Sequence, residues 1–200
     1  TFGSGHSRFI AGELYWRAGG MASVMMINDP MSGSAERLEG VAEVILKRYD
    51  IQSGDLLFVI SNSGINPLPL EMALEGRKAG AVVIAVTNVA QSQQSQSRHS
   101  SGQRLFEVAS HILDTRVPFG DAVVPLEVNS STWHVAPVST LVSVAMLNAV
   151  VAETAHILVS RGVTPPVLVS ANVPEGDENN RHLCDKYWQR LAEFPRRQPT

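Results

Sequence analysis

Two short segments of the chain carry small polar side chains whose spacing suits the binding of an anion. One is Ser61-Asn62-Ser63-Gly64, which we call the serine turn, and the other is Gly3-Ser4-Gly5-His6-Ser7, which we call the glycine loop. Hydroxyl and backbone N–H groups donate hydrogen bonds to a phosphate, so neither segment needs a cationic side chain to hold one. The serine turn, with two hydroxyl groups one residue apart, is therefore the main candidate for a phosphate site.

The elements on either side of the serine turn determine where it lies. Residues 56–60 form an uninterrupted apolar run, which predicts a strand buried on both faces of a sheet, and the turn opens a helix that runs to Gly80. The next apolar run, Val82 to Val86, completes a strand–helix–strand unit. Such a unit predicts a right-handed crossover and parallel strands. Ligands of these folds collect at the carboxyl ends of the strands, which is where the serine turn lies.

The same residues also fit a helix start that binds no ligand. Ser63 or Asn66 would then satisfy an unpaired N–H group, and Pro67 would occupy the first helical turn. The glycine loop favours a ligand, because it also runs from a strand end into a helix, and two such loops can face one ligand. The glycine loop lacks the third glycine of a dinucleotide-binding fingerprint and the lysine of a P-loop, so nucleotide binding is disfavoured.

The remaining periodic segments complete an α/β pattern. They predict a helix ending by Ala18, a strand over 22–27, a helix over 34–49, strands over 112–114 and 122–128, a polar loop over 87–102, an apolar helix from Pro137 to Gly162 and a last helix over 182–194. This order predicts a doubly wound, mainly parallel five-stranded sheet flanked by helices, a flavodoxin-like three-layer sandwich. We expect one domain over residues 1–200, with a truncated first strand and a C-terminal extension over 163–200.

Composition narrows the class of protein. A hydrophobic content of 44% in 200 residues supports one sizeable core, and the scattered cations with a net charge of −3 disfavour nucleic-acid binding. The single cysteine, Cys184, cannot form an internal disulfide, so we expect a cytoplasmic protein. Asn148 and Glu153 interrupt the apolar stretch Val135–Val159, which favours a buried helix over a membrane span. No cluster has metal-ligand spacing, so we predict no metal and no cofactor.

The two loops together resemble the SIS (sugar isomerase) domain family of phosphosugar isomerases and phosphosugar-binding proteins. The resemblance covers residues 1–162 and rests on Gly3-x-Gly5-x-Ser7 before a helix, on Ser61-x-Ser63-Gly64 after a strand and on the strand Val82 to Thr87. Around Arg98–Gly102 and Pro137–Thr140 the chain is most similar to bacterial sugar-isomerase-domain proteins without an assigned activity, which are related to phosphoheptose isomerases.

This resemblance implies roles for residues in both loops and beyond them. For the phosphate it implies contacts with Ser7, Ser61, Asn62, Ser63, Gly64 and Asn66. For the sugar it implies contacts with Gly5, His6, Thr87, Ser139 and Thr140. Asn66 stands where the family often has threonine or serine, and an amide can donate the same hydrogen bond.

Interconversion of aldose and ketose phosphates needs a base that moves a proton between adjacent carbons and a group that opens the ring. Glu13 resembles the base glutamate of the heptose-phosphate isomerases, although an ion pair with Arg17 four residues later would also explain it. His99 lies in the polar loop, where packing requires no imidazole, and could act as the acid or ring opener. Two alternatives stay open: a non-catalytic phosphosugar sensor, and a lyase (etherase) that removes a 3-substituent from an amino-sugar phosphate.

The long apolar helix also bears on assembly. Its apolar residues between Val138 and Val159 cover nearly its whole circumference, so it must be covered on all sides. Either the C-terminal helix near Leu191 or a second copy of the chain would supply that cover. Because SIS domains commonly pair, we expect a homo-oligomer, at least a dimer, and no membrane partner.

Overall fold

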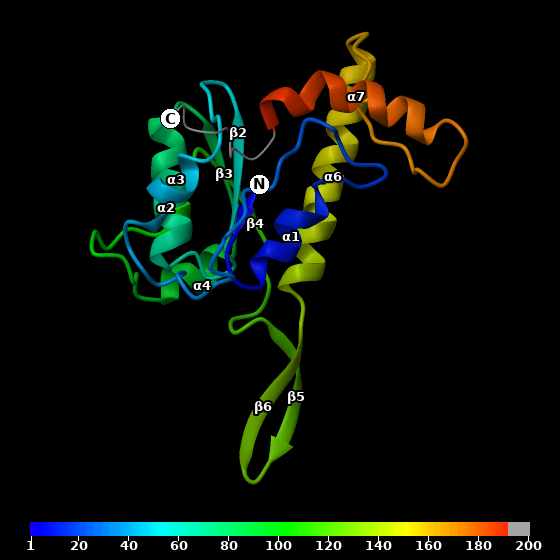
Figure 1. Ribbon diagram of the computed structural model, residues 1–200. Helices are drawn as coiled ribbons and strands as arrows, with labels where there is room; N and C mark the ends of the chain where they lie inside the picture. Colours follow the sequence, from blue (N-terminus) through cyan, green and yellow to red (C-terminus); the bar gives the residue numbers. More distant parts are fainter. Residues whose placement is uncertain (192–200) are drawn as a thin grey trace.

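A four-stranded parallel sheet forms the centre of the fold in the computed structural model, which describes residues 1–191 (Figure 1). The strands lie in the order β1-β2-β3-β4. Their bounds are Phe2–Gly3 for β1, Leu56–Ile60 for β2, Val82–Thr87 for β3 and His111–Asp114 for β4. The parallel sheet and the strand–helix–strand unit around the serine turn are thereby confirmed.

Helices cover both faces of this sheet (Figure 1). One face carries α2 (Val41–Leu46), α3 (Pro67–Lys78) and α5 (Leu105–Val108), and the other carries α1 (Ser7–Glu13) and α6 (Ser139–Ser160). Alternate residues of β2 supply the two cores, because successive side chains of a strand point to opposite faces. Leu57 and Val59 pack under α3, whereas Ile60 packs with α1 and α6.

The strand predicted over residues 22–27 is reduced to a single parallel bridge between Ile27 and Phe2. Its neighbour β1 has only two residues, so a longer ladder has no partner to pair with. The prediction of five strands is therefore wrong by one, and the apolar run packs mainly as irregular backbone beside β1.

Two predicted helices are shorter than expected. The helix predicted over 34–49 is confined to α2, because Gly40 before it has a left-handed backbone with φ of 80°. The helix predicted to reach Ala18 ends at Glu13, and Trp16 beyond it has φ of 49°. Conversely, the polar loop contains a short helix, α4 (Val89–Gln94), whose first turn is capped by the Asn88 side chain.

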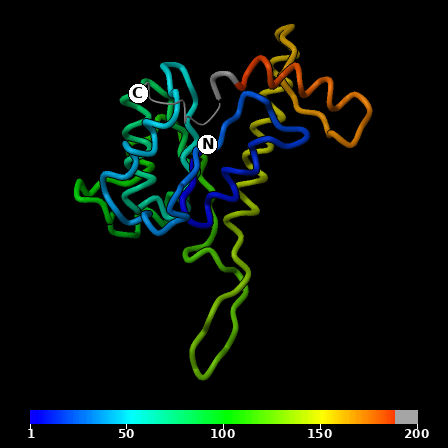
Figure 2. The backbone as a smooth tube through the Cα atoms, viewed as in Figure 1, coloured from blue at the N-terminus to red at the C-terminus, as the bar shows by residue number. Residues whose placement is uncertain are grey.

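A β-hairpin follows β4 and projects away from the sheet (Figures 1 and 2). Its strands are β5 (Ala122–Val128), which was predicted, and β6 (Ser131–Pro137), which was not. They pair antiparallel, and the two residues between them, Asn129 and Ser130, both have positive φ, as a tight hairpin turn of type I′ requires. The predicted helix therefore begins at Ser139, after β6, and not at Pro137.

Helix α6 is confirmed in extent, but the expectation that it is buried is wrong for a single chain. Only Ser139, Ser143 and Leu147 are buried along its 22 residues. By length and composition, α6 is also a candidate membrane span. The last helix, α7 (Gly176–Leu191), packs near the far end of α6, and the predicted helix residues 192–194 lie outside the described residues.

Candidate functional site at the carboxyl edge of the sheet

The serine turn and the glycine loop begin side by side. Strands β1 and β2 are parallel neighbours, and Gly3 is paired with Ile60. The chain leaves β1 into the glycine loop and leaves β2 into the serine turn, so both loops lie on one edge of the sheet. The structure thus brings together two segments that are more than fifty residues apart in the sequence.

Hydrogen bonds from the neighbouring strand fix the serine turn from behind. The Thr87 hydroxyl donates to the backbone oxygen of Asn62 at 3.2 Å, and the N–H group of Asn88 donates to the same oxygen at 2.9 Å. Within the turn, the N–H group of Gly64 donates to Oγ of Ser61 at 3.3 Å. Ser61 is buried and Ser63 is half-buried, so the Ser63 hydroxyl is the more accessible of the two. Thr87, predicted to touch the sugar, is fully buried and supports the turn.

The start of α3 offers few free N–H groups to a ligand. Pro67 and Pro69 have no N–H group, and the N–H group of Leu68 donates to the backbone oxygen of Glu36 at 3.2 Å. Among the described residues, the N–H groups of Ser63 and Ile65 have no partner. The N–H group of Gly64 between them donates to Ser61, so Ser63 and Ile65 supply two separate free donors beside the turn.

Gly64 allows a prediction about the shape of the turn. Its φ of 62° is left-handed, and a Cβ atom there would lie 2.7 Å from Oγ1 of Thr87. We expect Gly64→Ala to lower the melting temperature measured by thermal unfolding, because backbone strain of about 1–3 kcal/mol is added to a steric clash. Gly102→Ala is the matched control, since its φ of 73° gives the same strain with no atom within 4 Å of the new Cβ. Equal losses in the two variants would contradict the close contact with Thr87.

The glycine loop is held by a buried carboxylate. The Ser4 hydroxyl donates to Oδ2 of Asp29 at 2.7 Å, and the N–H group of Gly33 donates to the same oxygen at 2.8 Å. A Cβ atom on Gly33 would lie 2.7 Å from the Cα atom of Gly5, so residues 29–33 pack directly against the loop. Ser7 is half-buried at the start of α1 and His6 is exposed, which places both predicted contact residues at this edge.

Sequence reasoning missed Glu36 and Arg98, which join the two loops through Asn66. The Asn66 amide donates to Oε1 of Glu36 at 2.8 Å, and Nη1 of Arg98 donates to Oδ1 of Asn66 at 2.8 Å. Oε2 of Glu36 has no hydrogen-bond partner among the described residues and lies 3.4 Å from the position of a Cβ atom on Gly5. The site therefore includes a carboxylate without a cationic partner and an exposed guanidinium. Only the inclusion of Arg98 in the family-like segment 98–102 pointed to either of them.

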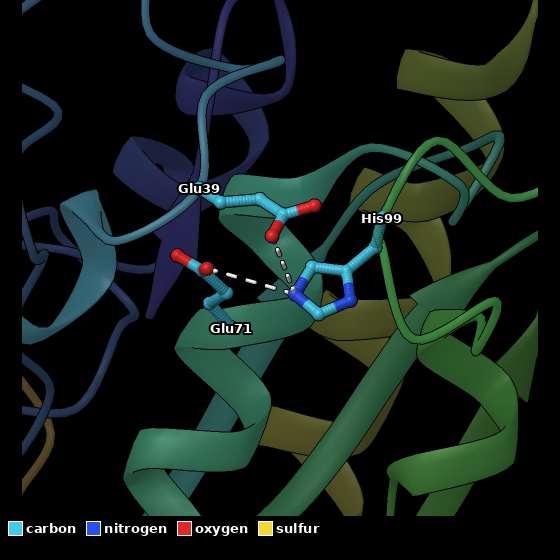
Figure 3. Close-up of side chains that lie close together, drawn as sticks. All are labelled: Glu39, Glu71 and His99. Atoms are coloured by element: carbon cyan, nitrogen blue, oxygen red, sulfur yellow. Dashed lines mark ion pairs between the residues drawn. The ribbon is translucent and has the colours of Figure 1, made fainter.

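Figure 3 shows the carboxylates of Glu39 and Glu71 beside the same ring nitrogen of His99. Its Nε2 atom is 3.6 Å from Oε1 of Glu71 and 3.9 Å from Oε2 of Glu39. The side chain of His99 is 12% exposed, so the expectation that packing requires nothing of this residue is wrong. Hydrogen bonds from the Ser100 hydroxyl and N–H group hold the pKa of Glu39 below its ordinary value.

The spacing of these three side chains would fit a metal ion, but the hydrogen bonds around the imidazole oppose one. The N–H group of Ser101 lies 3.0 Å from Nδ1 of His99, and a backbone amide can only donate. Nδ1 therefore accepts, the ring proton is on Nε2, and Nε2 has no lone pair for a metal. The geometry favours a structural role, in which contacts of His99 with Glu71 of α3 and with Glu39 hold the loop around His99 in place.

The other predicted residues, Glu13, Ser139 and Thr140, lie on α1 and α6. Glu13 ends α1, where it forms an ion pair with Arg17 and accepts a long hydrogen bond of 3.5 Å from Asn148. The Ser139 hydroxyl is engaged with Asp121 at 2.6 Å, and Thr140 is the next residue of α6. The ion pair considered for Glu13 is thus present.

A cavity of about 370 Å³ lies at the opposite, amino edge of the sheet, between the start of β2 and α6. Leu56, Val150 and Val151 are among its mostly apolar lining residues. It contains neither the serine turn nor the glycine loop, and its lining is mainly apolar. We therefore place the candidate site at the carboxyl edge.

A parallel three-layer fold with two polar loops at adjacent strand ends defines an α/β class of protein that binds ligands at the carboxyl edge of its sheet. The SIS domain family model matches residues 1–88. The chain is 40% identical to the UPF0309 protein of Halalkalibacterium halodurans, over 94% of this chain and 80% of the relative. It is 42% identical to the UPF0309 protein of Brucella anthropi, over 95% and 80% of the two chains. For the UPF0309 protein of Streptomyces avermitilis the identity is 38%, over 96% and 80%.

The chain belongs to the UPF0309 family and carries a SIS domain. A SIS domain implies phosphosugar binding, which agrees with the loops at the carboxyl edge.

Proposed function

We propose that the chain binds a sugar phosphate with its phosphate on the serine turn and its sugar toward the glycine loop, and that it interconverts aldose and ketose phosphates. The observation that carries the proposal is the pairing of Gly3 with Ile60, which sets both loops at one edge. The free N–H groups of Ser63 and Ile65 support it, since a dianionic phosphate needs several donors.

Two carboxylates are candidates for the base that moves the proton. Glu13 has the position that the family resemblance favours, but Arg17 neutralises it. Glu36 receives a hydrogen bond from the neutral amide of Asn66, and its second oxygen lies beside Gly5, between the two loops. We prefer Glu36, because a base must reach the sugar with an oxygen that no cation occupies.

His99 is a weaker candidate for ring opening than its sequence position suggested. Its Nδ1 atom faces Ser101 and its Nε2 atom faces Glu71, so neither nitrogen is free for a ligand. We propose that His99 acts by holding the neighbouring Arg98 beside Asn66, where the guanidinium adds positive charge near the phosphate.

A panel of hexose, heptose and amino-sugar phosphates tests this function. We expect calorimetry to detect binding of at least one compound, and NMR to show its conversion between aldose and ketose forms. Tight binding without turnover would favour a phosphosugar sensor, and release of a 3-substituent would favour a lyase. Absence of binding by every compound would refute a phosphosugar site.

We also propose that the chain works as a homo-oligomer in the cytoplasm. The exposure of apolar side chains along α6 supports assembly, because an apolar helix is stable in water only when it is covered.

A further inference from the structure

The β5–β6 hairpin has one apolar face that nothing in the described chain covers. Val124 is paired with Val135 and Leu126 with Trp133, so these four side chains lie on the same face of the ribbon. Trp133 is 61% exposed, and the other three are exposed as well. The opposite face carries Pro125 paired with His134 and polar pairs such as Glu127 with Thr132, joined by a hydrogen bond of 2.9 Å.

An isolated two-stranded hairpin is at best marginally stable in water and needs packing against another element. Figure 1 shows that this hairpin projects from the molecule with no helix or sheet beside it. Its sequence nevertheless favours the observed form, with left-handed Asn129 and Ser130 at the turn and β-branched or aromatic residues in the strands. A ribbon built in this way is expected to bind a partner surface.

The base of the hairpin is hydrogen-bonded to the start of α6. Asp121, just before β5, accepts hydrogen bonds from the N–H groups of Val138 and Ser139 at 3.0 and 2.6 Å and from the Ser139 hydroxyl at 2.6 Å. These bonds tie the base of the ribbon to the first turn of the helix. Leu141, two residues further along the helix, is 71% exposed, so apolar surface continues from the ribbon onto α6.

We propose that the apolar face of β5–β6 and the exposed side of α6 form one docking surface, and that its occupant is the same surface of a second copy of this chain. The size is compatible with this: stable interfaces use about 20–30 residues on each side, and two strands of seven residues with a helix of 22 contain more residues than that, of which those on one side take part.

The charge of this surface also favours self-association. Glu127 and Glu153 are the acidic residues of β5, β6 and α6, and no lysine or arginine occurs in these three elements. Glu127 belongs to the polar face of the ribbon. A two-fold contact places like against like, so a surface with almost no charge binds its own copy without repulsion.

The test compares charge substitutions on the two faces of the ribbon by sedimentation equilibrium. The parent protein should have the mass of two chains, or a multiple of it, where one chain is 21.6 kDa. The double variant Leu126→Lys with Trp133→Lys should raise the dissociation constant of the dimer by at least roughly 100-fold, because anchors of this kind dominate an interface. The matched control, Thr132→Lys with His134→Lys, adds the same charge to the polar face and should leave the mass of the assembly unchanged.

A second measurement needs no variant and does not depend on how the substitutions fold. Hydrogen exchange of the hairpin amides in the parent protein should slow as protein concentration rises, because association covers them. A parent that is monomeric across micromolar concentrations would overturn the proposal, as would an apolar-face variant that keeps the mass of the parent. A monomeric parent that sediments with phosphatidylcholine vesicles would assign the surface to a membrane.

Discussion

Replacing both hydroxyl groups of the serine turn, Ser61→Ala with Ser63→Ala, is expected to weaken sugar-phosphate binding at least tenfold in calorimetry. Each hydroxyl that donates to a charged group contributes ~1.5–3 kcal/mol, and the backbone N–H groups of the turn would remain. The Ser63 hydroxyl should account for most of the loss, since Ser61 is buried and already accepts from Gly64.

The matched control removes two hydroxyl groups at the opposite edge of the sheet. Ser53 and Ser110 are exposed and lie near the amino ends of β2 and β4. Ser53→Ala with Ser110→Ala should bind the same compound as tightly as the parent. If the serine-turn variant also binds like the parent while its melting temperature is unchanged, the phosphate is held elsewhere.

Glu36→Gln is expected to lower turnover at least roughly 100-fold, the lower range for loss of a general base, with phosphate binding nearly intact. Glutamine keeps the oxygen that accepts from Asn66, so the junction of the two loops keeps its shape, while the basic carboxylate is lost. Incorporation of solvent deuterium at C2 of the converted sugar phosphate measures the proton transfer directly.

Glu13→Gln serves as the comparison for that experiment. It removes a carboxylate that is paired with Arg17 and should reduce turnover far less. The opposite result, with an active Glu36→Gln protein and an inactive Glu13→Gln protein, would assign the base to Glu13. A parent protein without turnover on any compound would instead refute isomerisation itself.

Sequence patterns predicted the parts of the site that depend on local order. The apolar run of β2, the serine turn and the helix through α3 follow one another, and each has a residue type that defines its boundary, such as Gly54 before the strand and Gly80 after the helix. Those elements appear in the structure at nearly the predicted positions, because burial on both faces of a sheet leaves an apolar sequence few alternatives.

The parts that were missed depend on contacts between distant segments. Asn66 meets Glu36 across 30 residues and Arg98 across 32, and no periodicity encodes such pairs. Glu36 also lies in the segment that was predicted to be a helix over 34–49, which gave no sign of a contact with Asn66. Strand β6 was missed because Pro137, at its end, suggested the start of a helix.

The conformation of the serine turn depends on hydrogen bonds from a distant segment of the chain. Its own carbonyl oxygen at Gly64 accepts from the N–H group of Leu105 at 2.9 Å, and the next carbonyl, of Ile65, accepts from Arg98 at 2.9 Å. The segment from Arg98 to Leu105 is thus hydrogen-bonded to the backbone that ends the serine turn. Moving Ser61-Asn62-Ser63-Gly64 into another strand–helix junction would transfer the sequence of the turn without the hydrogen bonds that support it. A graft that keeps the shape of the turn must therefore include residues 97–105.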